Sequence, residues 1–265
     1  KIVKCLSFCD IMPPKRAMLE LQDGGGYCLD IRLHHIERGS GAPLILLHGN
    51  GESLRYFKYQ YDFFAPHVRV IGVDTRGHGS SPRGAAPFTL EQFAEDLKDF
   101  MDEMGIPRAH ILGFSDGGNI ALLFALKYPG MVSRLILNGA NLTPSGVKAS
   151  AQAPVYIRYG KASLLSLFDK KAVRSKELLG LMARQPQIRR AQLASLKVPV
   201  LVIAGKNDMI KDSHTRSIAA AIPEAQLCIL EGDHFVARRN SGIFNQTVLD
   251  FLQKEGSERK ERAVL

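Results

Sequence analysis

The stretch from Ala109 to Lys127 constrains the fold most, because it joins a predicted strand to a predicted helix through a very tight turn. Ala109–Leu112 is an apolar run typical of a short buried strand, and Asn119–Lys127 has a helical pattern. Between them lies Gly113-Phe114-Ser115-Asp116-Gly117, which matches the pattern G-x-S-x-G. Such a turn strains its central residue and needs small residues two positions to either side, because a Cβ there would collide with the crossing backbone. It lifts the hydroxyl of Ser115 clear of the sheet at a helix N-terminus, whose amides face a developing anion.

Apolar runs and helical patterns alternate along most of the chain. The predicted strands are Leu44–Leu47, Val68–Val73, Ala109–Leu112, Val132–Asn138, Val198–Ala204 and Ala225–Leu230, preceded by a β-hairpin of Ala17–Leu21 and Tyr27–Leu33. Helices are predicted after most of these strands, the last two at Asp212–Ala221 and Ser241–Lys254. This alternation predicts an α/β fold with a mostly parallel central sheet that helices cover on both faces.

The alternation stops at Thr143-Pro144 and resumes at Val198. The segment between has helical stretches such as Ser163–Met182 and no strand signal, so we interpret it as a small helical insertion on top of the sheet. The predicted organisation is a core of residues 17–141 and 196–254, an insertion of residues 142–195, and loosely ordered termini of residues 1–16 and 255–265.

Composition places the chain among soluble globular proteins, since 45% of its 265 residues are hydrophobic and 23% are charged. No apolar run approaches the length of a membrane span, and the N-terminus lacks the apolar centre of a signal peptide, so no membrane partner is expected. The cysteines lack zinc-type spacing, which favours a reducing cytoplasm: they are Cys5, Cys9, Cys28 and Cys228.

The net charge of +9 is concentrated in one segment. Residues 142–195 contain ten basic side chains and two acidic ones, a net charge of +8. No nucleic-acid-binding motif accompanies them, so no nucleic-acid partner is expected. Solvated faces of the inserted helices are the favoured interpretation of this charge, and an interaction protein whose insertion binds an acidic partner is the alternative.

A serine hydroxyl needs a base to take its proton and an acid to hold that base. Such groups lie beyond the carboxyl ends of parallel strands. Downstream of Ser115, Asp208 and His234 both follow predicted strands, in the order Ser, Asp, His. We predict His234 as the base and Asp208 as the acid. Asp233 is the alternative acid, but its position next to His234 points it away from the ring, and His214 lies too near Asp208 in sequence to be the base.

The tetrahedral intermediate of acyl transfer needs donors that face its oxyanion. One predicted donor is the backbone N–H of Asp116, which follows the nucleophile at the start of a helix. The second is the backbone N–H of Asn50, in the loop after the strand Leu44–Leu47, where Gly49 and Gly51 permit a close approach.

Together these motifs resemble the α/β-hydrolase superfamily. The resemblance rests on His48-Gly49-Asn50-Gly51, Asp74-Thr75-Arg76-Gly77-His78-Gly79-Ser80-Ser81, the serine turn, Gly205-Lys206-Asn207-Asp208 and Gly232-Asp233-His234. It implies that the insertion is a lid and that Asp74–Ser81 is a structural turn. Haloalkane dehalogenases and epoxide hydrolases of this superfamily carry an aspartate where Ser115 stands, so those activities are disfavoured.

The segment Phe114-Ser115-Asp116-Gly117-Gly118 is similar to the turn of valacyclovirase-type amino-acid-ester hydrolases. That resemblance implies that Asp116 receives the ammonium of an α-amino ester. The alternative is that Asp116 only interacts favourably with the helix dipole. The basic lid points instead to an anionic substrate, so the substrate class stays open.

The function we expect is a serine hydrolase that cleaves a small carboxylic ester through an acyl-enzyme, with no cofactor and no metal. A thioesterase, an amidase, a lactonase, a C–C bond hydrolase and a cofactor-free haloperoxidase or perhydrolase remain alternatives on the same triad. A non-catalytic receptor for a small ligand is the alternative from another class. The oligomeric state is left open.

Overall fold

Residues 30–254 are described by a computed structural model of the chain, and seven strands within them form one sheet. In chain order the strands are β1 (His35–Arg38), β2 (Pro43–Leu47), β3 (Arg69–Val73), β4 (Ala109–Phe114), β5 (Val132–Asn138), β6 (Val200–Asn207) and β7 (Gln226–Asp233). Their order across the sheet is β1-β3-β2-β4-β5-β6-β7. Only β1 is antiparallel to its neighbour, so the prediction of a mostly parallel sheet is confirmed.

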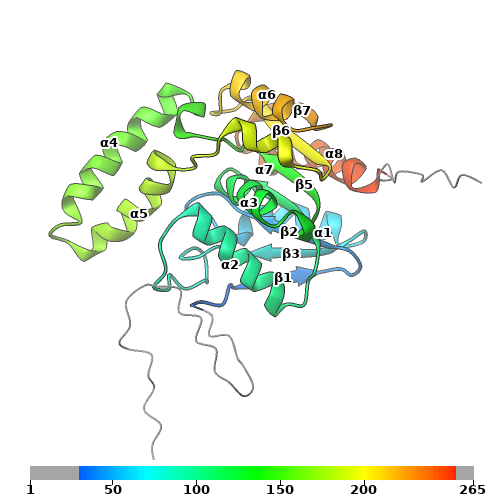
Figure 1. Cartoon of the computed structure of the whole chain (residues 1–265), viewed down its shortest axis with the longest axis horizontal. Helices are drawn as coiled ribbons and strands as arrows, with labels where there is room; N and C mark the ends of the chain where they lie inside the picture. The colour runs from blue at the N-terminus through cyan, green and yellow to red at the C-terminus, as the bar shows by residue number, and fades with distance from the viewer. Residues whose placement is uncertain (1–29, 255–265) are drawn as a thin grey trace, which may run out of the picture.

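Helices lie on both faces of this sheet (Figure 1). The α-helices are α1 (Lys58–Phe64), α2 (Leu90–Glu103), α3 (Asp116–Lys127), α4 (Ala149–Leu165), α5 (Lys170–Arg184), α6 (Asp212–Ala221), α7 (Val236–Arg239) and α8 (Ser241–Gln253). Short 3-10 helices are η1 (Leu54–Phe57), η2 (Pro129–Met131), η3 (Pro144–Gly146) and η4 (Arg190–Ser195).

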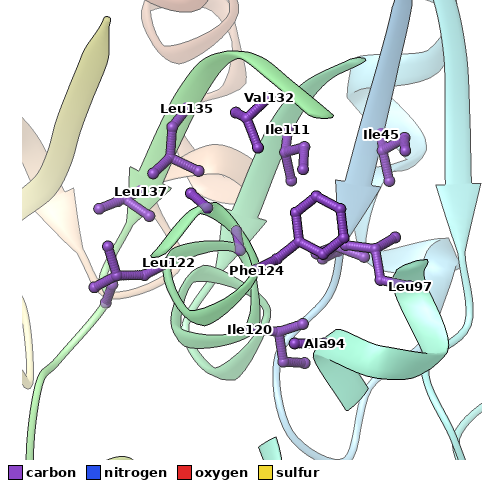
Figure 2. Close-up of a cluster of buried hydrophobic side chains, with 14 of the residues drawn as sticks. Ile45, Ala94, Leu97, Ile111, Ile120, Leu122, Phe124, Val132, Leu135 and Leu137 are labelled. Carbon is purple, nitrogen blue, oxygen red and sulfur yellow. The ribbon is translucent and has the colours of Figure 1, made fainter. Parts of the chain in front are cut away.

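The central strands are apolar on both faces, which explains why helices cover both. Side chains alternate between the two faces of a strand. In β2, Ile45 and Leu47 join a buried cluster with α2, α3 and α6, whereas Leu44 and Leu46 join a second cluster with α1, α7 and α8. Figure 2 shows the first cluster, in which Phe124 of α3 lies near Ile111 of β4 and Leu97 of α2, and Ile120 lies beside Ala94 of α2. The two cores fix the sheet between its helices, and with it the strand ends that hold the site.

The edge strand β1 differs from the prediction. A hairpin was expected from Ala17–Leu21 and Tyr27–Leu33, but its first strand lies outside the described residues, and residues 30–33 form no strand. The strand begins later, at His35, and pairs with β3. Its sequence, His-Ile-Glu-Arg, is only partly buried, so backbone hydrogen bonds to β3 define it rather than an apolar run.

The insertion also differs in one respect from its prediction. A helical stretch was expected over Ser163–Met182, but the chain turns between α4 and α5, which pack together as a helical hairpin. Asp169 begins the second helix, because its carboxylate accepts a hydrogen bond from the backbone N–H of Lys171 at 2.8 Å. The hairpin connects β5 to β6 and projects from the body of the molecule (Figure 1). The division into a core and a lid stays a prediction.

The expectations about the termini and most of the cysteines concern residues that the structure does not describe. The expected loose termini, residues 1–16 and 255–265, and three of the four cysteines lie outside the described residues. Cys228 is a half-buried free thiol in β7. Among residues 30–254, no helix combines the length and the apolar character that crossing a bilayer would require.

Candidate active site

Ser115 occupies the sharp turn between β4 and α3. Its backbone has φ +53° and ψ −119°, a conformation that is strained for a residue with a Cβ. A Cβ at Gly113 would lie 2.2 Å from the carbonyl oxygen of Gly117, and one at Gly117 would lie 2.0 Å from the carbonyl oxygen of Leu47. Both positions therefore require glycine, for the steric reason that the sequence pattern suggested.

The structure brings Ser115, His234 and Asp208 together in one chain of hydrogen bonds. Ser115 Oγ lies 3.0 Å from Nε2 of His234, and Nδ1 of His234 lies 2.7 Å from Oδ1 of Asp208. Since a carboxylate only accepts, Nδ1 carries the proton and Nε2 is free to accept one from the serine. This is the geometry that a serine nucleophile and its base require.

Parallel strands explain why residues so distant in sequence meet here. β6 and β7 are paired neighbours, with Asn207 opposite Asp233, and the two loops that follow carry Asp208 and His234. Asp208 is also held by the backbone N–H of Ile210, which donates to Oδ1 at 2.9 Å. Both Asp208 and His234 are buried, so their orientation is fixed by packing.

The alternative acid, Asp233, is engaged elsewhere. Its Oδ1 accepts the backbone N–H of Phe235 at 3.0 Å, and its Oδ2 pairs with Arg239. His214 is likewise occupied, because its Nε2 accepts the backbone N–H of Leu142 at 3.0 Å. Neither residue contributes to the hydrogen-bonded chain at Ser115.

Gly139, at the end of β5, makes room for the imidazole of His234. Its φ is +64°, and a Cβ there would lie 2.8 Å from Cε1 and 2.9 Å from Nδ1 of His234. On another side, the ring of Phe114 lies 4.9 Å from that of His234, centroid to centroid. The sequence analysis did not single out Gly139. A glycine directly after a buried strand, at the edge where the other site residues gather, was the available signal.

The loop His48–Gly51 passes directly over the nucleophile. A Cβ at Gly49 would lie 3.0 Å from the ring of Phe114 and 3.3 Å from the Cβ of Ser115, so glycine makes this close approach possible without displacing either side chain. Asp116 is the first residue of α3, and the backbone N–H of a first helical residue has no acceptor within its helix. The predicted oxyanion donors, the N–H groups of Asn50 and Asp116, thus belong to segments that flank Ser115.

His48 holds that loop in place from the buried side. The backbone N–H of Thr75 donates to its Nε2 at 3.1 Å, so its Nδ1–H donates to the carbonyl oxygen of Gly49 at 2.8 Å. Burial lowers the pKa of His48 to about 4, and the hydrogen bond to Gly49 only partly offsets this. The imidazole is therefore neutral near pH 7 and ties the loop to the turn after β3.

The side chain of Asn50 has a second role that the sequence did not predict. Its Nδ2 donates to Oδ2 of Asp116 at 3.0 Å and to the carbonyl oxygen of Leu178 in α5 at 2.8 Å. Asn50 thus joins the nucleophile helix to the helical insertion. No sequence signal indicates this contact, because Asn50 and Leu178 are 128 positions apart.

The carboxyl group of Asp116 is buried beside the site and interacts with neutral partners. Asn50 donates to its Oδ2 and Asn119 donates to its Oδ1 at 3.3 Å. Burial raises the pKa of Asp116 to about 6, although both amide hydrogen bonds act in the opposite direction. Within residues 30–254, no salt bridge is formed by this carboxylate.

A cavity of about 540 Å³ adjoins the loop His48–Gly51 and is lined in part by Glu52, Tyr56 and Arg238. Glu52 Oε2 and the Tyr56 hydroxyl are buried, and neither has a hydrogen-bond partner among residues 30–254. Burial raises the pKa of Glu52, whereas the nearby Arg238 and His234 side chains lower it. The sequence analysis missed these residues, because Arg238 comes from α7, far along the chain from Glu52.

The segment Asp74–Ser81 forms a turn whose polar groups bind one another. Oδ1 of Asp74 accepts the backbone N–H of Leu54 at 2.7 Å, and Oδ2 accepts that of Ser80 at 2.9 Å. Arg76 is fully buried and forms two hydrogen bonds, of 2.7 and 2.6 Å, with Asp96. The turn thereby supports the loop of His48, to whose Nε2 the backbone N–H of Thr75 donates. Among the described residues, no group of three or more His, Cys, Asp or Glu side chains could hold a metal ion.

Comparisons with known proteins agree with this architecture. The family model of the α/β hydrolase fold matches residues 42–169. A 2-hydroxy-6-oxo-6-phenylhexa-2,4-dienoate hydrolase from Burkholderia cepacia is 30% identical over 84% of this chain and 92% of the relative. A solved hydrolase from Pseudomonas aeruginosa PA01 has a TM-score of 0.68 at 29% identity, over 83% of this chain and 94% of that one. An enol-lactonase from Burkholderia xenovorans LB400 shares the fold, with a TM-score of 0.70 at 24% identity, over 84% of this chain and 96% of its own. The chain therefore belongs to the α/β hydrolase fold family.

Proposed function

We propose that this chain is a serine hydrolase that cleaves a small carboxylic ester through an acyl-enzyme. The observation that carries the proposal is the pair of hydrogen bonds around His234, of 3.0 Å to Ser115 Oγ and 2.7 Å to Asp208 Oδ1. In the proposed reaction Ser115 is the nucleophile, His234 is the general base and Asp208 holds the imidazole.

In acylation, Ser115 Oγ attacks the ester carbonyl carbon while Nε2 of His234 takes the hydroxyl proton. The carbonyl oxygen becomes an oxyanion that accepts hydrogen bonds from the backbone N–H groups of Asn50 and Asp116. Loss of one such donor typically raises the barrier by about 3 kcal/mol. The intermediate then collapses, His234 gives its proton to the departing alkoxide, and an alcohol leaves.

Deacylation repeats these steps with water as the nucleophile. Nε2 of His234 takes a proton from the water, whose oxygen attacks the acyl carbon. Collapse of the second intermediate returns the proton to Ser115 Oγ and releases the carboxylic acid. The carboxylate of Asp208 stays ionised throughout and stabilises the imidazolium that forms in each half-reaction.

The ester substrate, defined by its acyl group and its leaving group, is the narrower part of the proposal. The relative from Burkholderia cepacia is named for a dienoate substrate rather than an ester, so members of this fold family differ in the bond they cleave. Thioester, amide and carbon–carbon bond hydrolysis, and perhydrolysis, use the same nucleophile and base, and each is an alternative outcome of a substrate panel.

An α-amino ester is the second candidate substrate, and the environment of Asp116 favours it. Its carboxylate is buried between Asn50 and Asn119, which are neutral donors and do not compensate its charge. A buried carboxylate is stabilised strongly by an opposite charge within a few ångströms. The ammonium of an α-amino ester would supply that charge.

The test of the serine hydrolase is covalent labelling by a fluorophosphonate together with hydrolysis of activated esters. We expect the wild-type chain to label and to turn over at least one ester, and Ser115→Ala to do neither. Ser217→Ala is the matched control, because this serine lies in α6 and its hydroxyl donates a hydrogen bond to the carbonyl oxygen of His214, away from the site. A wild-type chain that neither labels nor cleaves any member of the panel would contradict the proposal.

The amino-ester candidate is tested by pairs of activated esters with and without an α-amino group. We expect Asp116→Asn to raise KM for the amino esters much more than for their matched counterparts. Equal effects on both kinds of ester would remove the ammonium from the proposal and leave the serine hydrolase intact.

A further inference from the structure

The exposed apolar side chains of this chain are concentrated at one place. Among residues 30–254, nine large hydrophobic side chains are exposed, and seven of them belong to the α4–α5 hairpin: Tyr156, Ile157, Leu164, Leu165, Leu167, Phe168 and Val173. Large exposed side chains scattered singly need no explanation, but a contiguous group of them marks an interaction surface.

Four of the seven fall within five consecutive residues at the turn of the hairpin. We call Leu164, Leu165, Leu167 and Phe168 the apolar tip. Phe168 is 87% exposed, Leu167 69% and Leu164 62%. This tip lies at the far end of the hairpin, which projects from the body of the molecule (Figure 1), so none of the strands of the sheet covers it.

Basic residues flank the apolar tip on both helices. Lys161 lies one helical turn before Leu164, while Lys170, Lys171 and Arg174 occupy the first two turns of α5. All four are exposed, and no salt bridge within residues 30–254 involves any of them. Two acidic residues lie in this part of the hairpin, and both are engaged: Asp169 caps α5, and Glu177 forms an ion pair with Arg83. The apolar tip is therefore flanked by four basic side chains, which we call the basic collar: Lys161, Lys170, Lys171 and Arg174.

We propose that the apolar tip docks this protein on an anionic lipid surface. Leu167 and Phe168 enter the boundary between headgroups and acyl chains, and the collar of Lys161, Lys170, Lys171 and Arg174 contacts anionic headgroups. Each kind of contact alone gives weak and reversible attachment, and their combination gives stable binding. This proposal departs from the sequence-based expectation of no membrane partner, which rested on the lack of a membrane-spanning run and of a signal peptide and did not consider attachment to a membrane surface.

Charge decides between a lipid surface and a second copy of the chain. If two hairpins covered each other's tips, their basic collars would face each other with only Asp169, which caps α5, as an acidic partner. Like charges in an interface oppose association, whereas an anionic bilayer complements the collar. The same α5 carries Leu178, whose carbonyl oxygen bonds Asn50 at the site, so the docked hairpin remains tied to the loop over Ser115.

The test is co-sedimentation of the full chain with vesicles. One set is phosphatidylcholine alone and the other also contains phosphatidylglycerol, each at low and at high salt. We expect binding to the anionic vesicles only, and weaker binding at high salt. The variant Leu167→Ser/Phe168→Ser should bind at least about tenfold more weakly, since two large apolar side chains no longer enter the lipid. Lys170→Glu/Lys171→Glu should lose the preference for anionic vesicles.

Matched controls carry the same changes elsewhere on the surface. Tyr59→Ser/Ile243→Ser removes the two large exposed apolar side chains of residues 30–254 that lie outside the hairpin, and Lys197→Glu/Lys206→Glu reverses two exposed charges. Both should bind like the wild type. Wild-type protein that stays in the supernatant with anionic vesicles at low salt overturns the proposal, as does unchanged binding by the tip variant. A dimer in sedimentation velocity that only the tip variant loses would assign the tip to a second copy instead.

Discussion

Gly139 and His234 are in direct contact, because the glycine lacks the Cβ that would lie 2.8 Å from Cε1 of the imidazole. The position of the proposed base therefore depends on a backbone position directly after another strand, β5. Any side chain at residue 139 must displace the imidazole from Ser115 Oγ, from Asp208 Oδ1, or from both.

We expect Gly139→Ala to lower kcat on an activated ester by about 100-fold, since a displacement of about 1 Å at a reacting group has that effect. The matched control is Gly105→Ala. Gly105 has a nearly identical φ, +62° against +64°, but a Cβ there meets nothing within 4 Å. Both variants should lose about 1 kcal/mol of stability through the left-handed backbone, while only Gly139→Ala loses activity. Equal kcat values for the two variants would contradict this role of Gly139.

Gly117→Ala tests the steric basis of the nucleophile turn. The new Cβ would lie 2.0 Å from the carbonyl oxygen of Leu47, a backbone atom that cannot move without shifting β2. We expect the free energy of unfolding in urea to fall by about 3 kcal/mol, the upper range for overpacked sites. Gly242→Ala, in α8 with nothing within 4 Å of the new Cβ, should change it by less than about 1 kcal/mol. Similar small changes at both positions would show that the turn tolerates a side chain.

The buried carboxyl of Asp116 predicts a pH-dependent stability. Burial raises its pKa from the ordinary 3.8 to about 6 in the folded protein, so the carboxyl group binds its proton more tightly when folded. The contribution of this carboxyl group to the free energy of unfolding is fully present below about pH 4. It is lost as the pH rises through 6, and the loss is on the order of 3 kcal/mol. The stability of Asp116→Asn relative to wild type should therefore increase from pH 4 to pH 7 by about that amount.

Urea unfolding of Asp116→Asn and wild type at several pH values measures this difference. The asparagine also changes local hydrogen bonds, which offsets the free energy of unfolding of the variant from that of wild type by a constant amount. Only the change of this difference with pH therefore tests the prediction. A stability difference that stays flat between pH 4 and pH 7 would mean that the carboxyl is solvated in the folded protein.

The ion pair of Arg76 and Asp96 should contribute far more to stability than a surface pair. The side chain of Arg76 is fully buried and that of Asp96 nearly so. We expect Asp96→Asn to lower the free energy of unfolding by about 3 kcal/mol, because it leaves a buried cation with one charge partner fewer. Asp102→Asn breaks the exposed pair with Lys98 and should lower it by about 0.5 kcal/mol or less. Comparable losses in the two variants would falsify this ranking.

The sequence predicted β2 to β7 because each of these strands contains an apolar run, and such runs are stable only when buried on both faces. It failed to place β1, since His35–Arg38 has no such run and is a strand only through its pairing with β3. It also failed to find the turn between α4 and α5. Leu167 and Phe168 there resemble buried helical residues in sequence, but both are exposed.

The candidate site likewise contains residues that the sequence identified and contacts that it did not. Ser115 was identifiable because glycines two positions away on each side are a local steric requirement of the turn. Asp208 and His234 were identifiable because parallel strands bring their following loops to one edge. The contacts of Asn50 with Leu178, of Gly139 with His234 and of Arg238 with the cavity beside Glu52 had no such local signal.

The amino-acid sequence by itself determined the order of elements, the strained serine turn and the three polar residues at one sheet edge. Short-range sterics and apolar periodicity depend on residues that are close together in the sequence, so they can be recognised there. The tertiary structure decided which glycine borders the imidazole, what the side chain of Asn50 binds, and which apolar residues of the insertion stay uncovered. Those outcomes depend on distances between segments that are far apart along the chain, and such distances are set only when the sheet and its helices pack.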